Sequence, residues 1–552
     1  MSCSRANIAT TTRFTELLKL IVILLTVPPP NHVQCIDGKP PNIVIFMADD
    51  LGYGDLQSFG NPLSHTPNID ALIKAGIKFT QFYSASPICS PARAALLTGR
   101  YPIRTGVWND VNNAIFLQEN IGGLKLNETT VPEMLATRGY KSALIGKWHL
   151  GVGPEKEYLP THHGFDHYFG VPNSHADCPC DKCFFPNDDC NSGCQRAKAP
   201  CQLLLDDEII EQPVNLISLA ERQTRAARSF IQSNSCEGTP FFLMYASLHP
   251  HVPHFAGERF RNTTIGGDYT DSLAEFDGEV GDVMTELRNS GVLENTLVLL
   301  TSDNGPDLVE KKLGGFSGVF RCGKLSTFEG GVRVPTVAYW KGRIRQGVSA
   351  EFLSHLDIWP TLRSISGLPS DSQNVELDGF DFSSVLFKNG KSPRESMLFY
   401  DITPDPERGP FAIRTTTYKA HFLTECSIRC DGDAFDEMCR SNSSLTIQDP
   451  PLIYDLLLDP EERDDIGRTS EALVAEMTQL LQQETNKVAY SESTLKEEDE
   501  LHQLCCDPGC TPFPSCCDCP SQYADSLLPL YKDCKKLPLN TRIIYRKISH
   551  KC

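Results

Sequence analysis

Positive charge is scarce in this 552-residue chain, and long hydrophobic runs and internal repeats are missing from it. Lys and Arg number 51 against 70 Asp and Glu, so the formal net charge is −19. An acidic surface repels nucleic acid phosphates and anionic membranes, which argues against both as partners. Hydrophobic residues still make up 40% of the chain, enough for a large core, and the length favours two domains.

The mostly apolar stretch near the N-terminus, residues 17–27, is too short to span a bilayer. It follows Arg5 and Arg13 and ends at a run of three prolines. This order is typical of a cleaved secretory signal. Residues 1–36 are therefore predicted to be a signal peptide and leader, and no transmembrane anchor is expected.

Cysteines, in contrast, are abundant and clustered. Fifteen of the 22 fall in three segments, 178–201, 426–439 and 505–519, which are rich in loop-forming residues. A chain on the secretory route meets oxidising conditions, so these segments are predicted to be disulfide-stapled loops. The spacing at 178–183 could also form a zinc knuckle, which is the less favoured interpretation.

Three Asn-x-Ser/Thr sites are predicted acceptors of N-linked glycans wherever they are exposed. They begin at Asn127, Asn262 and Asn442.

Four apolar runs are predicted to be β-strands, and polar side chains that active sites use follow each of them. The runs cover residues 42–48, 142–145, 241–246 and 296–300. The polar residues that follow are Asp49 and Asp50, Lys147 and His149, His249 and His251, and Asp303 and Asn304. Ligand sites of open α/β sheets lie at the carboxyl ends of the strands, so we expect these groups to converge.

Helical patterns separate these strands, which indicates an α/β domain over residues 37–390. Apolar residues recur at helical spacing over 273–287, and the pattern ends before Gly291, a suitable C-cap.

The predicted secondary structure changes after about residue 390. Short strands and one helix are predicted at 397–400, 411–415, 418–423, 452–456 and 471–484. Residues 391–552 are therefore predicted to be a smaller α+β domain with a short antiparallel sheet, closed by the cysteine-rich tail.

Asp49, Asp50, Asp303 and Asn304 offer only oxygen ligands. Oxygen ligands select a hard cation such as Ca²⁺ or Mg²⁺ over zinc, so these residues are candidate metal ligands. The alternative is that Asp49 and Asp50 form a solvated turn and that Asp303-Asn304-Gly305 is a tight turn.

The run from Cys89 to Arg100 carries the strongest chemical signal. It places Cys89 before a Ser-Pro helix start, with Arg93 four residues on. Backbone N–H groups at a helix start and a guanidinium both favour an anion, so a nucleophile that handles oxyanions is predicted. A disulfide partner or an ordinary buried thiol is the alternative for Cys89.

The order of motifs resembles the type I sulfatases of the alkaline-phosphatase superfamily. The motifs are Asp-Asp-Leu-Gly-Tyr-Gly-Asp at 49–55, Cys-Ser-Pro-Ala-Arg at 89–93, Gly-Lys-Trp-His-Leu-Gly at 146–151, Ser-Asp-Asn-Gly-Pro at 302–306 and Cys-Gly-Lys-x-x-Thr-Phe-Glu-Gly-Gly-Val-Arg at 322–333. The resemblance covers nearly the whole mature chain, and it implies a large mixed central sheet flanked by helices.

The resemblance also implies that a formylglycine-generating enzyme oxidises Cys89 to Cα-formylglycine (3-oxoalanine). One position departs from the family pattern, since Ala92 stands where the family usually has Ser. The hydrated aldehyde would attack sulfur with one hydroxyl and expel sulfate with the other, which neither serine nor cysteine can do.

Roles for the remaining candidates follow from the same resemblance. Arg93 and Lys147 would hold the hydrated aldehyde, and His149 would help deprotonate its second hydroxyl. His251 and Lys324 would lie near the ester oxygen and protonate the departing alcohol. His249 and His254 compete with His251 for its role.

Four residues would bind substrate, namely Lys147, Ser174, His251 and Lys324.

Within the family, the segments at 151–155 and 418–422 and the tail from 505 are similar to arylsulfatases that act on galactosyl 3-sulfates of sulfoglycolipids such as cerebroside sulfate. The implied substrate is a sulfated glycolipid or aryl sulfate, with galactosamine 6-sulfate as the rival. The implied location is the lysosome, with an extracellular one as the alternative. The oligomeric state, a homo-oligomer included, is left open.

Two functions of other classes compete with sulfate ester hydrolysis. A phosphatase or phosphodiesterase of the same superfamily would use similar carboxylates with a Ser or Thr nucleophile. A protein that binds sulfated glycans without cleaving them would be favoured if Cys89 were unmodified.

Overall fold

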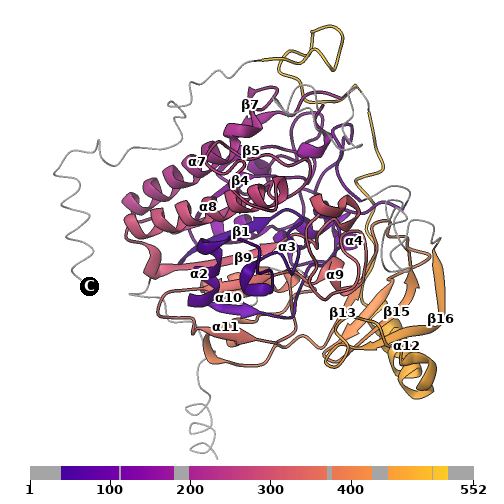
Figure 1. Cartoon of the computed structure of the whole chain (residues 1–552). Coiled ribbons are helices and arrows are strands. Elements are labelled where there is room, and N and C mark those ends of the chain that lie inside the picture. The colour runs from indigo at the N-terminus through magenta and orange to yellow at the C-terminus, as the bar shows by residue number, and fades with distance from the viewer. Residues whose placement is uncertain are drawn as a thin grey trace, which may run out of the picture.

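The computed structural model describes residues 39–110, 114–179, 198–369, 376–425, 445–499 and 501–519. The described residues form one large sheet wrapped by helices, a four-stranded sheet beside it and a short two-stranded sheet (Figure 1). The predicted signal peptide, Asn442 and the cysteine segment at 426–439 lie outside the described residues.

The large sheet has ten strands. Their order is β11 (Gly347–Ser349), β2 (Ile77–Phe79), β10 (Thr336–Tyr339), β9 (Thr296–Ser302), β1 (Asn42–Ala48), β8 (Phe241–Ala246), β4 (Lys141–Gly146), β5 (His167–Gly170), β6 (Leu203–Leu205) and β7 (Glu208–Glu211). The five strands from β9 to β5 run parallel, whereas β10, β6 and β7 pair antiparallel with their neighbours. The predicted mixed α/β sheet is confirmed.

Strand β1 lies at the centre of the sheet and is buried on both faces, which explains why its sequence is apolar throughout. Ile43, Ile45 and Met47 belong to one apolar cluster, whereas Val44, Phe46 and Ala48 belong to another. A strand covered on both faces needs apolar residues at every position.

Helices cover both faces of the large sheet. One face packs against α2 (Pro67–Ala75), α7 (Leu216–Glu237) and α8 (Asp268–Asn289). The other packs against α3 (Cys89–Thr98), α5 (Val131–Ala136), α10 (Ile358–Ile365) and α11 (Ser383–Lys388). Shorter elements are β3 (Phe82–Tyr83), α4 (Pro102–Thr105), α9 (Glu329–Val332) and β12 (Leu353–Ser354), and β12 pairs with β3.

The four strands predicted to carry the site are β1, β4, β8 and β9, which are parallel neighbours. Their carboxyl ends therefore meet at one edge of the sheet. Gly146 at the end of β4 has a φ of +114°, and a Cβ there would lie 1.9 Å from the Ala246 carbonyl oxygen. Only glycine allows β4 and β8 to approach this closely.

The small sheet is antiparallel, as predicted. Its order is β13 (Ser396–Phe399), β14 (Ala412–Thr415), β15 (Tyr418–Thr424) and β16 (Thr446–Asp455), with α12 (Glu471–Thr485) packed against it. Met397, Ile413 and Met477 share an apolar cluster with Tyr101 and Ile103 of the larger part. A domain boundary near residue 390 stays a prediction.

The cysteine-rich tail contains three disulfides, Cys505–Cys517, Cys506–Cys519 and Cys510–Cys516. It does not close the small sheet, contrary to our expectation from chain order. It lies against the far edge of the large sheet, where Gln212 and Cys519 exchange backbone hydrogen bonds (Figure 1).

The disulfide interpretation of the first cysteine segment is confirmed at its ends. Cys178 pairs with Cys201, so Cys178 is not a zinc ligand. Residues 180–197 lie outside the described part of the chain.

Two buried carboxyl groups, Asp55 and Glu279, should make the fold more stable in acid. Burial raises the pKa of each to about 7, and Glu275 beside Glu279 adds to the effect there. Between about pH 4 and 7 the folded protein therefore keeps protons that the unfolded chain releases, so stability falls as the pH rises through this range.

We expect a higher melting temperature at pH 5 than at pH 7.5, measured by scanning calorimetry. Glu279→Gln should shrink this difference, because glutamine does not titrate, keeps one acceptor oxygen and can donate through its NH2 to the second of the two hydroxyls, those of Ser247 and Tyr245. An undiminished difference in that variant would count against Glu279 as a source of acid stability.

Candidate active site

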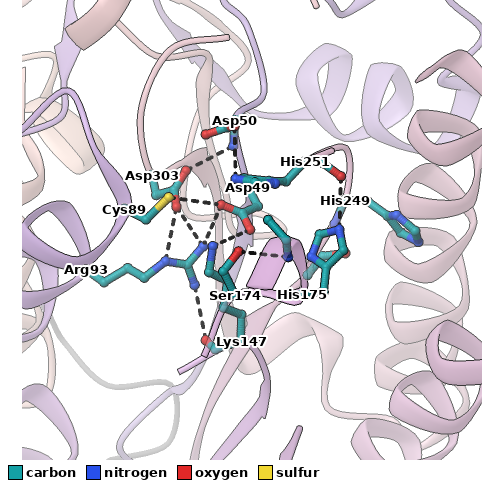
Figure 2. A network of polar contacts seen from close by, with 12 residues as sticks. Asp49, Asp50, Cys89, Arg93, Lys147, Ser174, His175, His249, His251 and Asp303 are labelled. Atoms are coloured by element: carbon teal, nitrogen blue, oxygen red, sulfur yellow. Dashed lines mark hydrogen bonds and ion pairs between the residues drawn. The ribbon is translucent and has the colours of Figure 1, made fainter. Parts of the chain in front are cut away.

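The carboxyl ends of β1, β4, β8 and β9 bring the predicted polar groups together, as Figure 2 shows. Asp49 directly follows β1 and contacts three of these groups. Its carboxylate lies 2.7 Å from Lys147 Nζ, 3.3 Å from Arg93 Nη2 and 3.5 Å from Cys89 Sγ. Burial disfavours the charged carboxylate, but the charges of Lys147, Arg93 and Lys324 outweigh it and lower the pKa of Asp49 well below its usual value.

Arg93 links the helix of Cys89 to the end of β9. Its Nη2 and Nε donate to Asp303 Oδ2 at 2.7 and 3.1 Å, and its Nη1 donates to the Lys147 carbonyl at 3.1 Å. The Asp50 N–H donates to Asp303 Oδ1 at 3.1 Å. A guanidinium that is 1% exposed and hydrogen-bonded at all three nitrogens has a fixed orientation.

Lys324 reaches the same group of residues from a loop far along the chain. Its Nζ lies 2.6 Å from Asp50 Oδ2 and 3.0 Å from His251 Nε2. His251 Nε2 lies 3.4 Å from Asp50 Oδ2. Burial and the Lys324 charge both lower the pKa of His251, so its ring is neutral beside the lysine.

Three carboxylates, those of Asp49, Asp50 and Asp303, face three cations here. The three cations are Arg93, Lys147 and Lys324. A fourth carboxylate, that of Asp307, lies 3.9 Å from Lys324 Nζ, so the protein charges leave the site with one net negative charge, and an added divalent cation would make it positive and attractive to an anionic ester.

The predicted metal ligands fit a hard cation. Asn304 donates through Nδ2 to Asp50 Oδ1 at 2.7 Å, while its Oδ1 is buried and has no hydrogen-bond partner among the described residues. Ligand atoms of Asp49, Asp50 and His251 lie within 4.8 Å of one another and of Cys89 Sγ. Ca²⁺ and Mg²⁺ are coordinated by oxygen atoms such as these carboxylates and the unpaired amide oxygen beside them.

Cys89 is a free, buried thiol, which contradicts the alternative that it forms a disulfide. It is the first residue of α3, and all ten residues of that helix are buried. Burial raises the pKa of the Cys89 thiol well above its usual value, and Lys147 does not offset this. An unmodified Cys89 would therefore stay protonated and be a weak nucleophile.

His149 and Asp50 share a strained backbone. Their φ angles are +60° and +62°, in the left-handed region that side chains usually avoid. Such strain persists where the surrounding structure fixes a functional geometry. Both ring nitrogens of His149 are buried without a hydrogen-bond partner among the described residues, so they can serve a bound molecule.

Ser174 follows β5, whose end lies beside that of β4. Its hydroxyl accepts a hydrogen bond from the Ala176 N–H at 3.3 Å and caps a short 3₁₀ helix. Its neighbour His175 is a residue that sequence reasoning missed. His175 Nε2 lies 3.0 Å and 3.2 Å from the carbonyls of Pro253 and His251 and so holds the His251 segment. No sequence signal marks this contact, because it depends on β5 lying near β8.

The structure separates the three competing histidines. Only His251 faces Asp50 and Lys324. His249 points to α8, where its Nε2 lies 3.0 Å from Glu275, and Figure 2 shows it turned away from the carboxylates. His254 packs edge-on against Tyr269.

Comparisons with known proteins agree with this geometry. Residues 41–368 match the sulfatase family, and residues 392–519 match the C-terminal region of aryl-sulfatase. The chain belongs to the sulfatase family. It is therefore a sulfate ester hydrolase that carries both regions of an arylsulfatase.

The sulfatase is similar to human arylsulfatase A, with 46% identity over 88% of this chain and 97% of the relative. It shares 35% identity with rat N-acetylgalactosamine-6-sulfatase, over 87% of this chain and 92% of the relative. The second match means that overall similarity by itself does not fix the substrate.

Among solved structures, the sulfatase is similar to the PsFucS1 sulfatase from Pseudoalteromonas sp.. The TM-score is 0.69 at 26% identity, covering 89% of this chain and 96% of that one. A phosphonate monoester hydrolase of Agrobacterium radiobacter shares the fold alone, with a TM-score of 0.52 at 20% identity over 81% of this chain and 96% of that one.

Proposed function

We propose that this sulfatase cleaves the 3-sulfate of galactosyl lipids, and aryl sulfates, at a formylglycine made from Cys89. The observation that carries the proposal is the 46% identity to arylsulfatase A over 97% of that protein's length. The raised pKa of the unmodified thiol adds support, because a protonated cysteine would not serve as the nucleophile.

The neighbours of residue 89 would orient its reacting oxygens. When formed, the aldehyde supplies through its hydrate one hydroxyl that attacks sulfur and a second that expels sulfate. Arg93 and Lys147, both held by buried carboxylates, would fix the position of these hydroxyls. His149, with free ring nitrogens, would accept the proton of the second hydroxyl.

His251 and Lys324 would act at the ester oxygen. Their nitrogens lie 3.0 Å apart, so both would lie beside the ester oxygen, where the lysine can donate a proton to the departing alcohol. Alkoxides of sugars are poor leaving groups, and this protonation would matter most for them.

Asp49, Asp50, Asp303 and Asn304 would hold the divalent cation. That cation would polarise the sulfate oxygens as a Lewis acid.

A substrate panel tests this function. We expect sulfate release from nitrocatechol sulfate and from a 3-sulfated galactosyl lipid in detergent micelles, but little from N-acetylgalactosamine 6-sulfate. Mass spectrometry of the peptide with residue 89 should find formylglycine in the active preparation. Residue 89 present only as cysteine, without activity, would favour a non-catalytic sulfated-glycan binding protein instead.

N-Acetylgalactosamine 6-sulfate is the second candidate substrate, because the 35% identity to that sulfatase spans almost the same part of the chain. Preferential release from this sugar would replace the lipid proposal while leaving the sulfatase chemistry in place. An aryl phosphate serves as the control for the phosphatase alternative.

We also propose a lysosomal destination reached by the secretory route. Asn127 and Asn262 are exposed and can accept glycans, and the disulfides require an oxidising compartment. No helix among the described residues is long and apolar enough to cross a membrane.

A further inference from the structure

A buried ionic cluster joins the small sheet to the loop that carries Lys324. Lys419 Nζ on β15 lies 2.9 Å from Glu329 Oε1 at the start of α9. Glu462 lies 3.3 Å from the same Nζ and accepts a hydrogen bond from the Glu329 N–H at 2.6 Å. All three side chains are fully buried. None of them takes part in the proposed reaction.

His421, two residues after Lys419, holds the same loop through its ring. It stacks on Phe328 with ring centroids 4.4 Å apart, and its Nε2 lies 2.8 Å from Glu462 Oε1. Its Nδ1 lies 3.4 Å from the Thr327 hydroxyl. The small sheet thus contacts the loop at three consecutive residues, 327 to 329.

The loop needs such support because its backbone is strained around Lys324. Cys322 and Leu325 have φ angles of +58° and +72°, which cost a side-chain-bearing residue free energy. The Lys324 and Leu325 N–H groups donate to the carbonyls of Pro306 and Pro87 at 2.8 and 2.9 Å. Strained conformations persist only when their surroundings determine them.

Glu329 transmits the same support to two other parts of the site. Its Oε2 accepts a hydrogen bond from the Tyr83 hydroxyl at 2.6 Å, on the strand that leads to Cys89. Two residues on, the Gly331 carbonyl accepts the N–H of Gly305, the neighbour of Asn304, at 2.9 Å. These two contacts tie α9 to the segments that lead to Cys89 and Asn304, so the loop of Lys324 is fixed relative to them.

We propose that Lys419, His421 and Glu462 are positioning residues that hold Lys324 at the leaving-group oxygen. The small sheet would then contribute to catalysis by positioning an active-site residue, although it supplies no catalytic residue itself. This inference rests on the proposed role of Lys324 as the donor of the leaving-group proton.

The test compares two substrates that differ in leaving group. A misplaced Lys324 should slow release of a poor leaving group, because an alkoxide needs the proton, whereas a nitrocatechol departs with little help. For Glu462→Ala we expect kcat on the galactosyl lipid sulfate to fall about tenfold or more, and kcat on nitrocatechol sulfate by less than about threefold.

Two further variants separate positioning from stability. Glu462→Gln keeps the acceptor for the Glu329 N–H and should restore most of the lost kcat. Glu211→Ala breaks the buried Glu211–Arg222 ion pair at the far edge of the large sheet and should lower the melting temperature without changing the ratio of the two rates. If Glu462→Ala does not fold, His421→Gln removes the stacking on Phe328 and takes its place.

An unchanged ratio of the two rates in folded Glu462→Ala or His421→Gln would overturn the inference. The wild-type enzyme tests the proposed function separately. If it does not cleave the galactosyl lipid, a pair of aryl sulfates with good and poor leaving groups supplies the same comparison.

Discussion

Cys89→Ser should give a folded, secreted protein that hardly turns over nitrocatechol sulfate. We expect the rate of multiple turnover to fall by about 10⁴-fold or more, as it does in other enzymes that lose a covalent nucleophile. Serine fits the buried start of α3 and leaves the contacts of Arg93 with Asp303 and Lys147 in place. Its one hydroxyl could accept sulfate once but has no second hydroxyl to expel it.

The measurement is sulfate release over many enzyme equivalents, with intact-protein mass spectrometry to detect a single trapped sulfate. Far-UV circular dichroism should match the wild type. Cys89→Ala is the matched control, since it should bind substrate and trap nothing. Sustained turnover by purified Cys89→Ser would contradict the elimination step.

Chelation of divalent cations should abolish activity while leaving the fold intact. Asp49, Asp50 and Asp303 each have a cationic partner in the protein, so loss of the metal leaves no unpaired cluster of negative charge. The loss of activity follows because the polarising charge at the sulfate is gone.

Activity and circular dichroism are to be recorded before and after dialysis against a chelator. Adding back Ca²⁺ or Mg²⁺ identifies the working ion by the extent of recovery. Asn304→Ala should weaken cation affinity, since its orphaned oxygen is a proposed ligand. Unfolding on chelation would instead assign the cation a structural role.

Local patterns were sufficient for most of the fold. The runs at 42–48 and 241–246 are strands with those same bounds, and the helix expected over 273–287 is the central part of α8. Such elements are readable because a buried strand or an amphipathic helix leaves a periodic trace in its own residues. The prediction that the cysteine-rich tail packs on the small sheet was wrong, because the order of segments along the chain does not determine which surface a segment covers.

The candidate site was predictable where a motif is contiguous and less so where it depends on contacts between distant residues. Asp49, Cys89 and Lys147 follow from short motifs. The family resemblance favoured His251, but His249 and His254 lie within six residues and stayed competitors until their orientations in the structure separated the three. His175 and Glu462 carry no local signal.

The sequence by itself determined the residue types, their order and the strand ends at which they lie, since these are properties of short segments. Tertiary structure alone decided which charges became partners. Lys324 forms an ion pair with Asp50, 274 positions away in the sequence, and Lys419 forms one with Glu329, 90 positions away. Such pairings depend on how whole sheets pack, and burial then strengthens each one because water no longer screens the charges.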